Sequence, residues 1–130
     1  MAEPFPKSRQ LARGERRYRR KVASPKQWQR IIAAKQGPCR VCVDPTFNGG
    51  LYSSAPALIE FHHLVPRDLG GDDVADNIVP LCGVHHELVT VFGRPECERL
   101  RASLTAAERA YVVGRLGEDG LRRLFGAARA

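Results

Sequence analysis

The 130-residue chain lacks several features that would assign it to a class directly. No run approaches the ~20 apolar residues that are needed to cross a bilayer. The first ten residues, MAEPFPKSRQ, contain no apolar segment of the kind found in a secretory signal, and there is no internal repeat. We therefore expect a cytoplasmic protein of one domain without membrane contact, in which cysteine more often binds metal than forms disulfides.

Acidic residues are scarce at the start of the chain. Residues 1–30 contain ten Lys or Arg against two Glu, a surplus of eight, whereas the whole chain has a net charge of +7. The positive charge therefore belongs to an N-terminal arm, which we take as residues 1–23. Such an arm is either a disordered solubilising tail or a contact that neutralises nucleic-acid phosphates without sequence preference. The residues expected to contact nucleic acid are Arg16, Arg17, Arg19, Arg20 and Lys21.

The first predicted helix follows the arm. Ser24 suits the N-cap of this helix, and Pro25 suits its first turn. Gln27, three residues after Ser24, completes a capping box. The helix is expected to stop at Gly37 and Pro38. Three large apolar residues share one of its faces, which predicts a core helix: Trp28, Ile31 and Ile32.

Two short strands and a second helix are predicted in the centre of the chain. The strands are residues 58–62 and 78–81, and Pro80 indicates that the second one lies at an edge. A long exposed loop with four Asp residues, from Arg67 to Asp76, separates the strands. The second helix is expected from Gly83 to Phe92.

The C-terminal part is predicted to be helical from Pro95 onward. Thr105 and Glu108 form a second capping box, which opens a helix with Tyr111 on its apolar face. A last short helix is expected around residues 121–125. The fold class is therefore α+β, with an arm at residues 1–23, a core at residues 24–92 and a helical tail packed on the core at residues 93–130.

Cysteine and histidine are few, with four residues of each. Cys39 and Cys42 form a C-x2-C pair, and Cys82 and His85 form a C-x2-H pair. Two such pairs supply the four ligands that a tetrahedral structural Zn²⁺ takes. A lone C-x2-C pair could instead be a redox motif, which the second pair disfavours. The remaining Cys97 is interpreted as a small buried residue.

The histidines occur in two doublets. His62 and His63 are adjacent on a predicted strand, so their side chains point to opposite faces. One of them can hold a metal while the other faces a substrate. His85 and His86 are adjacent on a helix and diverge by about 100°. His85 can therefore face the sulfurs while His86 faces a second site, which Asn77 is expected to join.

This pattern resembles the HNH endonuclease family. The resemblance rests on the order and spacing of four segments within residues 39–89: Cys39-x2-Cys42, the HHLVP of residues 62–66, Gly70-Gly71, and the NIVPLCGVHH of residues 77–86. It implies a ββα-metal fold with a zinc knuckle, and it leaves the basic arm and the helical tail outside. The whole chain is also similar to small HNH proteins of phage genomes.

The resemblance implies a role for each residue of the second site. His63 occupies the position of the general base, and Asn77 the position that holds the loop orienting this base. His62 and His86 occupy the ligand positions of one catalytic divalent metal, for which Mn²⁺, Ni²⁺, Zn²⁺ and Mg²⁺ stay open. The colicin-type branch has a further His where this chain has Thr90, so water and phosphate oxygens would complete the coordination.

The implied function is metal-dependent hydrolysis of DNA phosphodiester bonds, by nicking or by double-strand cutting. Arg67 belongs to no strict motif and is a candidate phosphate contact. The likeness to phage proteins favours DNA packaging or processing beside a terminase, in the host cytoplasm. Two other functions stay open. A non-catalytic, zinc-stapled nucleic-acid-binding module would leave the second site without a purpose, and a zinc-dependent protein-interaction or redox-sensing domain would not explain the charge.

Overall fold

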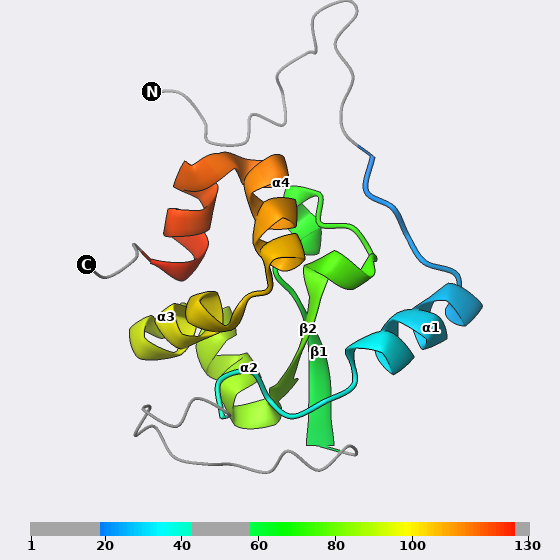
Figure 1. Ribbon diagram of the computed structural model, residues 1–130, viewed down its shortest axis with the longest axis horizontal. Coiled ribbons are helices and arrows are strands. Elements are labelled where there is room, and N and C mark those ends of the chain that lie inside the picture. Colours follow the sequence, from blue (N-terminus) through cyan, green and yellow to red (C-terminus); the bar gives the residue numbers. More distant parts are fainter. Residues whose placement is uncertain (1–18, 43–57, 127–130) are drawn as a thin grey trace, which may run out of the picture.

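A computed structural model of the chain describes residues 19–42 and 58–126. These residues form an α+β structure in which a two-stranded antiparallel sheet lies among four helices (Figure 1). Part of the predicted arm, with Arg16 and Arg17, lies outside the described residues. In chain order the elements are α1 (Pro25–Lys35), β1 (Ile59–His63), the 3₁₀ turns η2 (Arg67–Leu69) and η3 (Ala75–Asn77), β2 (Ile78–Cys82), α2 (Gly83–Thr90), α3 (Arg94–Ser103) and α4 (Ala106–Phe125).

The two strands lie within one residue of their predicted positions. They pair in antiparallel register, with Ile59 opposite Cys82 and His63 opposite Ile78. All of β2 is buried. Both strands of a two-stranded sheet are edge strands, so Pro80 lies on an edge strand as predicted. Its carbonyl accepts a hydrogen bond from the Arg40 amide (3.1 Å). Because α2 starts at the residue after β2, the arrangement is compatible with a small zinc ββα domain.

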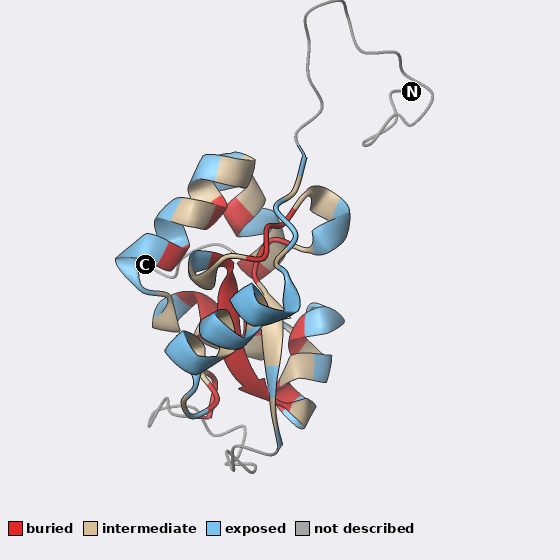
Figure 2. Cartoon of the chain, turned by 90° about the vertical axis from the view of Figure 1, so that its right-hand side faces the viewer, coloured by how far each residue is buried: buried red, intermediate tan, exposed pale blue. Residues whose placement is uncertain are grey.

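Helix α1 begins as predicted but is not a core helix. Ser24 and Gln27 form both hydrogen bonds of the capping box. No residue of α1 is buried, and the three predicted core residues, Trp28, Ile31 and Ile32, do not reach the core. Figure 2 shows the helix largely exposed in front of the buried strand β2. An apolar face shows which side of a helix meets the rest of the protein. How deeply the helix is buried depends on which other segments cover its remaining sides.

The segment from Arg67 to Asp76 is not the exposed loop that its composition predicts. It contains the 3₁₀ turn η2 and the first two residues of η3, and Gly71, Asp72 and Asp73 are buried. Burial of a carboxylate requires partners. Asp72 accepts hydrogen bonds from the Lys21 amide (2.6 Å) and the Tyr111 hydroxyl (2.6 Å), whereas Asp73 accepts one from the Ala23 amide (3.0 Å). Residues 20–23, which the sequence assigns to the arm, are thus bonded to the core.

One apolar core joins the remaining elements. Its buried members come from the segment after α1, the residues that follow β1, strand β2, and helices α2 to α4. They include Val41, Val65, Leu81, Val89, Leu100, Val112, Leu121 and Phe125. The last helix is kinked at Gly117, which has a φ of 75°. The short helix predicted around residues 121–125 is the part of α4 that follows this kink. Cys97 is buried in α3, as predicted, and burial raises its pKa to about 11.

Replacing Gly71 by Ala should destabilise the protein, because a Cβ at this position would lie 1.7 Å from the Val65 carbonyl oxygen. Overpacking of this kind costs roughly 1–3 kcal/mol, and the obstacle here is backbone. Gly114→Ala is the matched control, since nothing lies within 4 Å of the place that its Cβ would take. In the middle of a helix that change should stabilise by about 0.5–1 kcal/mol. Thermal unfolding followed by circular dichroism distinguishes the two, and equal melting temperatures would contradict the expectation.

Candidate metal centre and histidine cavity

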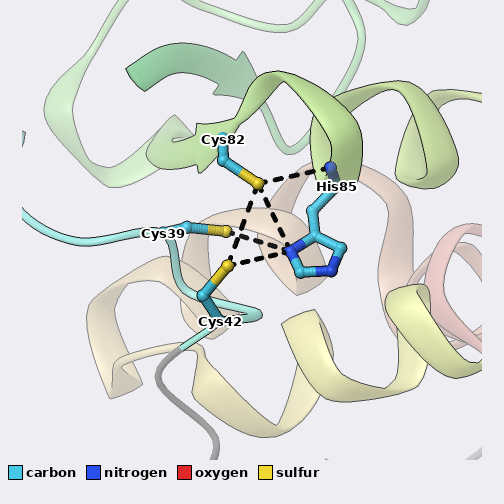
Figure 3. A group of neighbouring side chains, drawn as sticks. All are labelled: Cys39, Cys42, Cys82 and His85. Atoms are coloured by element: carbon cyan, nitrogen blue, oxygen red, sulfur yellow. Dashed lines mark hydrogen bonds between the residues drawn. The ribbon is translucent and has the colours of Figure 1, made fainter. Parts of the chain in front are cut away.

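Three cysteines and one histidine converge at the junction of three elements (Figure 3). Cys39 and Cys42 flank the turn after α1, Cys82 ends β2, and His85 lies in the first turn of α2. All four side chains are buried, and their ligand atoms lie within 4.8 Å of one another. The structure thus brings together the four residues predicted to bind the structural metal.

The distances within this cluster fit a tetrahedral zinc ion. With Zn–S of about 2.3 Å and Zn–N of about 2.0–2.1 Å, tetrahedral angles separate two sulfurs by about 3.8 Å and a sulfur from a nitrogen by about 3.5 Å. The Cys42 and Cys82 sulfurs are 3.8 Å apart. His85 Nδ1 lies 3.5, 3.2 and 3.5 Å from the sulfurs of Cys39, Cys42 and Cys82. The cluster could therefore hold a structural metal ion such as zinc.

A buried carboxylate anchors the cysteine turn to the rest of the protein. Arg40, between the two cysteines, donates to both oxygens of Glu108 at 2.8 Å, and Lys35 donates to one of them at 2.5 Å. Burial alone would raise the pKa of Glu108, but hydrogen bonds from Arg40, Lys35 and the Thr105 amide lower it to about 2. The carboxylate is therefore ionised at neutral pH, and it joins the end of α1 and the cysteine turn to the first turn of α4.

Replacing Cys39 by Ser should remove bound zinc and unfold the protein, because binding to a structural site contributes directly to folding free energy. Cys97→Ala is the matched control: it removes another buried cysteine, but one outside the cluster, and should leave zinc bound at one equivalent. Elemental analysis and thermal unfolding measure the two effects. If Cys39→Ser kept its zinc and its melting temperature, the structural role of the cluster would be wrong.

The other three histidines line one cavity of about 400 Å³. His62 and His63, from β1, and His86, from α2, face it together with aromatic and basic residues that include Trp28, Phe92 and Arg67. The rings of His62 and His86 meet edge to face, with centroids 5.2 Å apart. Strand alternation gives His62 and His63 different neighbours, although both reach this cavity.

His62 and His86 differ in their surroundings. Burial, with the nearby His86 and His63, lowers the pKa of His62 to about 3, so its imidazole is neutral at physiological pH. His86 Nδ1 lies 2.5 Å from the Glu60 carboxylate. Sequence reasoning missed Glu60, although a residue two positions before His62 on a strand shares its face. When a carboxylate engages Nδ1 in this way, Nε2 stays available as a ligand atom.

His63 is held by two contacts of its own. Its Nε2 lies 2.8 Å from Asp73 Oδ1, and its ring stacks on Trp28 with planes 8° apart and centroids separated by 5.8 Å. Burial lowers the pKa of His63, and the hydrogen bond to Asp73 opposes part of that shift. Asp73 was also missed by sequence reasoning, because an acidic residue in a Gly-rich stretch predicts exposure.

Asn77 is completely buried, and its side chain connects the start of the segment between the strands with the backbone of Asp72 further along it. Its Oδ1 accepts from the Val65 amide (2.7 Å), and its Nδ2 donates to the carbonyls of Val65 (3.1 Å) and Asp72 (3.0 Å). The Asn77 carbonyl accepts from the Leu64 amide (2.8 Å). These bonds fix the backbone immediately after His63.

The predicted nucleic-acid contacts separate into two kinds. Arg67 is exposed beside the cavity, with its Nε 4.0 Å from Asp73 Oδ1, and Arg19 and Lys21 are also exposed. Arg20 is different, because it donates to Asp73 Oδ1 (2.5 Å) and to the Gly71 carbonyl (2.8 Å). Its guanidinium is thus engaged within the protein. Thr90 lines the cavity and donates to the His86 carbonyl (2.7 Å).

Comparison with known proteins found no relative. No family model matches the chain, and no match was found among curated proteins or solved structures. Within residues 19–42 and 58–126, no helix has the length and apolar character needed to span a bilayer.

Proposed function

We propose that the chain is a metal-dependent endonuclease of the HNH class that hydrolyses DNA phosphodiester bonds. The observation that supports this most is the convergence of His62, His63 and His86 on one cavity. Two of these rings have one nitrogen engaged by a carboxylate, which leaves the other nitrogen for chemistry. The resemblance to the HNH pattern assigns these residues the base and ligand positions.

His63 is the general base of this proposal. Because burial lowers its pKa, the ring is neutral near physiological pH and can accept a proton from water. The water then attacks phosphorus in line, and the bond to the leaving 3′ oxygen breaks. The exposed Arg67 guanidinium, at the edge of the same cavity, binds a phosphate oxygen of the scissile region.

His62 and His86 would hold the catalytic divalent ion. Their rings meet edge to face with centroids 5.2 Å apart, and both line the same cavity. Imidazole ligands favour a transition metal such as Mn²⁺, Ni²⁺ or Zn²⁺ over Mg²⁺, which prefers oxygen ligands. When bound, the ion would supply positive charge to the phosphate oxygens. Glu60 fixes the orientation of the His86 ring.

A non-catalytic, zinc-stapled nucleic-acid-binding module is the second candidate. It accounts for the cysteine cluster and for the basic N-terminal residues. It does not explain why three histidines line one cavity, and we therefore rank it lower. DNA is the proposed partner in both cases, and a role in phage DNA packaging or processing beside a terminase in the host cytoplasm rests on the sequence resemblance.

A plasmid nicking assay with Mg²⁺, Mn²⁺, Ni²⁺ and Zn²⁺ in parallel tests the proposal. His63→Ala should keep its fold and its DNA affinity but lose about 10²–10⁴ in cleavage rate, the usual contribution of a general base. Glu118→Gln, an exposed change on α4, is the control and should cut at the wild-type rate. Cleavage by His63→Ala at the wild-type rate would refute the assignment of the base. DNA binding without cleavage by any of the metal-loaded proteins would favour the non-catalytic module.

Deletion of residues 1–18 should weaken DNA binding and flatten its salt dependence. Each phosphate contact that is lost reduces the slope of log K against log salt by about 0.9. Ending the deletion at residue 18 preserves the bonds from Arg20, Lys21 and Ala23 to the core. The melting temperature should therefore stay unchanged, which separates an effect on affinity from an effect on folding. An unchanged salt slope would contradict a phosphate-binding role for the arm.

A further inference from the structure

The Asp73 carboxylate is buried at the centre of a set of hydrogen bonds. Its Oδ1 accepts from Arg20 (2.5 Å) and lies 2.8 Å from His63 Nε2, and its Oδ2 accepts from the Ala23 amide (3.0 Å). The side chain is only 6% exposed. Of these partners, His63 is the one that takes part in the proposed hydrolytic step.

The contact between His63 Nε2 and Asp73 Oδ1, at 2.8 Å, decides which ring nitrogen of His63 carries hydrogen. Burial alone would raise the pKa of Asp73, but the bonds from His63 and Ala23 and the charge of Arg20 lower it overall. An ionised carboxylate can only accept hydrogen bonds. A neutral His63 ring facing it must therefore carry its hydrogen on Nε2, which leaves the lone pair on Nδ1.

We propose that Asp73 is a positioning residue that holds His63 in the Nε2–H tautomer, so that Nδ1 is the atom that takes the proton from the attacking water. The assignment of the tautomer stands on the Asp73 contact, whereas the role of Nδ1 rests on the proposed nuclease function. In that step an O–H bond of water breaks and an N–H bond forms at Nδ1, while the hydroxide oxygen bonds to phosphorus. The P–O bond to the 3′ oxygen breaks, its electron pair stays on that oxygen, and the oxygen takes a proton from solvent water. The resulting imidazolium is stabilised by the negative charge of Asp73.

The remaining partners of Asp73 make the position specific to a carboxylate. An Asn there has one accepting oxygen and one donating amide group, but it faces three hydrogen-bond donors. If its oxygen turned to Ala23, its NH₂ would face His63 and favour a hydrogen on Nδ1 instead. Arg20 and Ala23 thus orient Asp73, while Trp28 stacks against the His63 ring and holds its plane.

A purely structural role for Asp73, as the anchor of residues 20–23, is the competing interpretation. Tyr111→Phe provides a matched control for it. The Tyr111 hydroxyl donates to Asp72 Oδ2 (2.6 Å) and accepts from the Asp72 amide (2.9 Å), so its loss loosens the same segment without touching His63. A structural role predicts similar effects of Asp73→Asn and Tyr111→Phe, whereas a positioning role predicts different ones.

Two-bond ¹H–¹⁵N correlation spectra of the zinc-loaded full chain test the tautomer directly, at a pH well above the ordinary His value of about 6.5. The His63 signals, assigned by their loss in His63→Ala, should show the Nε2–H form in the wild type and in Tyr111→Phe. In Asp73→Asn the Nδ1–H form should appear. An unchanged Nε2–H pattern in Asp73→Asn would overturn the proposal, whether or not the protein cuts DNA.

Steady-state cleavage measures the consequence. Asp73→Asn should lower kcat by about 10²–10⁴, the range of a general base, with KM changed by a few-fold at most. Tyr111→Phe should keep kcat within a few-fold of the wild type. A wild-type kcat in an Asp73→Asn protein whose tautomer has changed would overturn the catalytic part. If the wild type cut no DNA, the nuclease proposal would fail, and the spectra would still decide the tautomer.

Discussion

The orientation of the second histidine doublet depends on the buried cysteine–histidine cluster. His85 belongs to the buried cluster of three sulfurs and one nitrogen, and His86 is the next residue of the same short helix. Neighbouring residues of a helix diverge by about 100°, so a ligand bond that holds the His85 ring also sets the direction in which His86 points. That direction is the cavity, where His86 meets His62. An ion held by the cluster would thus influence the proposed catalytic site through one peptide unit, without a direct contact between the two sites.

One face of α4 connects the cluster with the segment that carries Asp73. Glu108, Tyr111 and Arg115 are spaced by three and four residues, so they lie on one side of the helix. Glu108 binds the arginine of the cysteine turn, Tyr111 binds Asp72, and Arg115 donates to the Gly70 carbonyl (2.9 Å). The sequence places Tyr111 on an apolar face. Its hydroxyl instead gives a buried carboxylate one of the partners that its burial requires.

Features that depend on nearby residues were predicted well from the sequence, whereas pairings between distant residues were not. The capping boxes at Ser24 and Thr105 and both metal-ligand pairs depend on residues three positions apart, so their geometry is written in short stretches of sequence. The bonds from Arg20 to Asp73 and from Arg40 to Glu108 join residues more than fifty positions apart. From composition alone, many other acidic residues could have been the partners of Arg20 and Arg40. Burial of the segment around Asp72 was missed for the same reason, because it depends on partners from both ends of the chain.

The polar face of α4 also bears on how such a site could be moved between proteins. Residues 39–89 contain every ligand of both proposed metal sites, which suggests that this segment could be transferred to another protein by itself. The Gly70 carbonyl and Asp72, however, are bonded to α4 and to residues near Arg20. A graft of this segment alone would transplant the ligands without the groups that hold the adjoining backbone in place. The unit that could be inherited, fused or recombined as a whole therefore extends from Arg20 through α4, well beyond its recognisable motif.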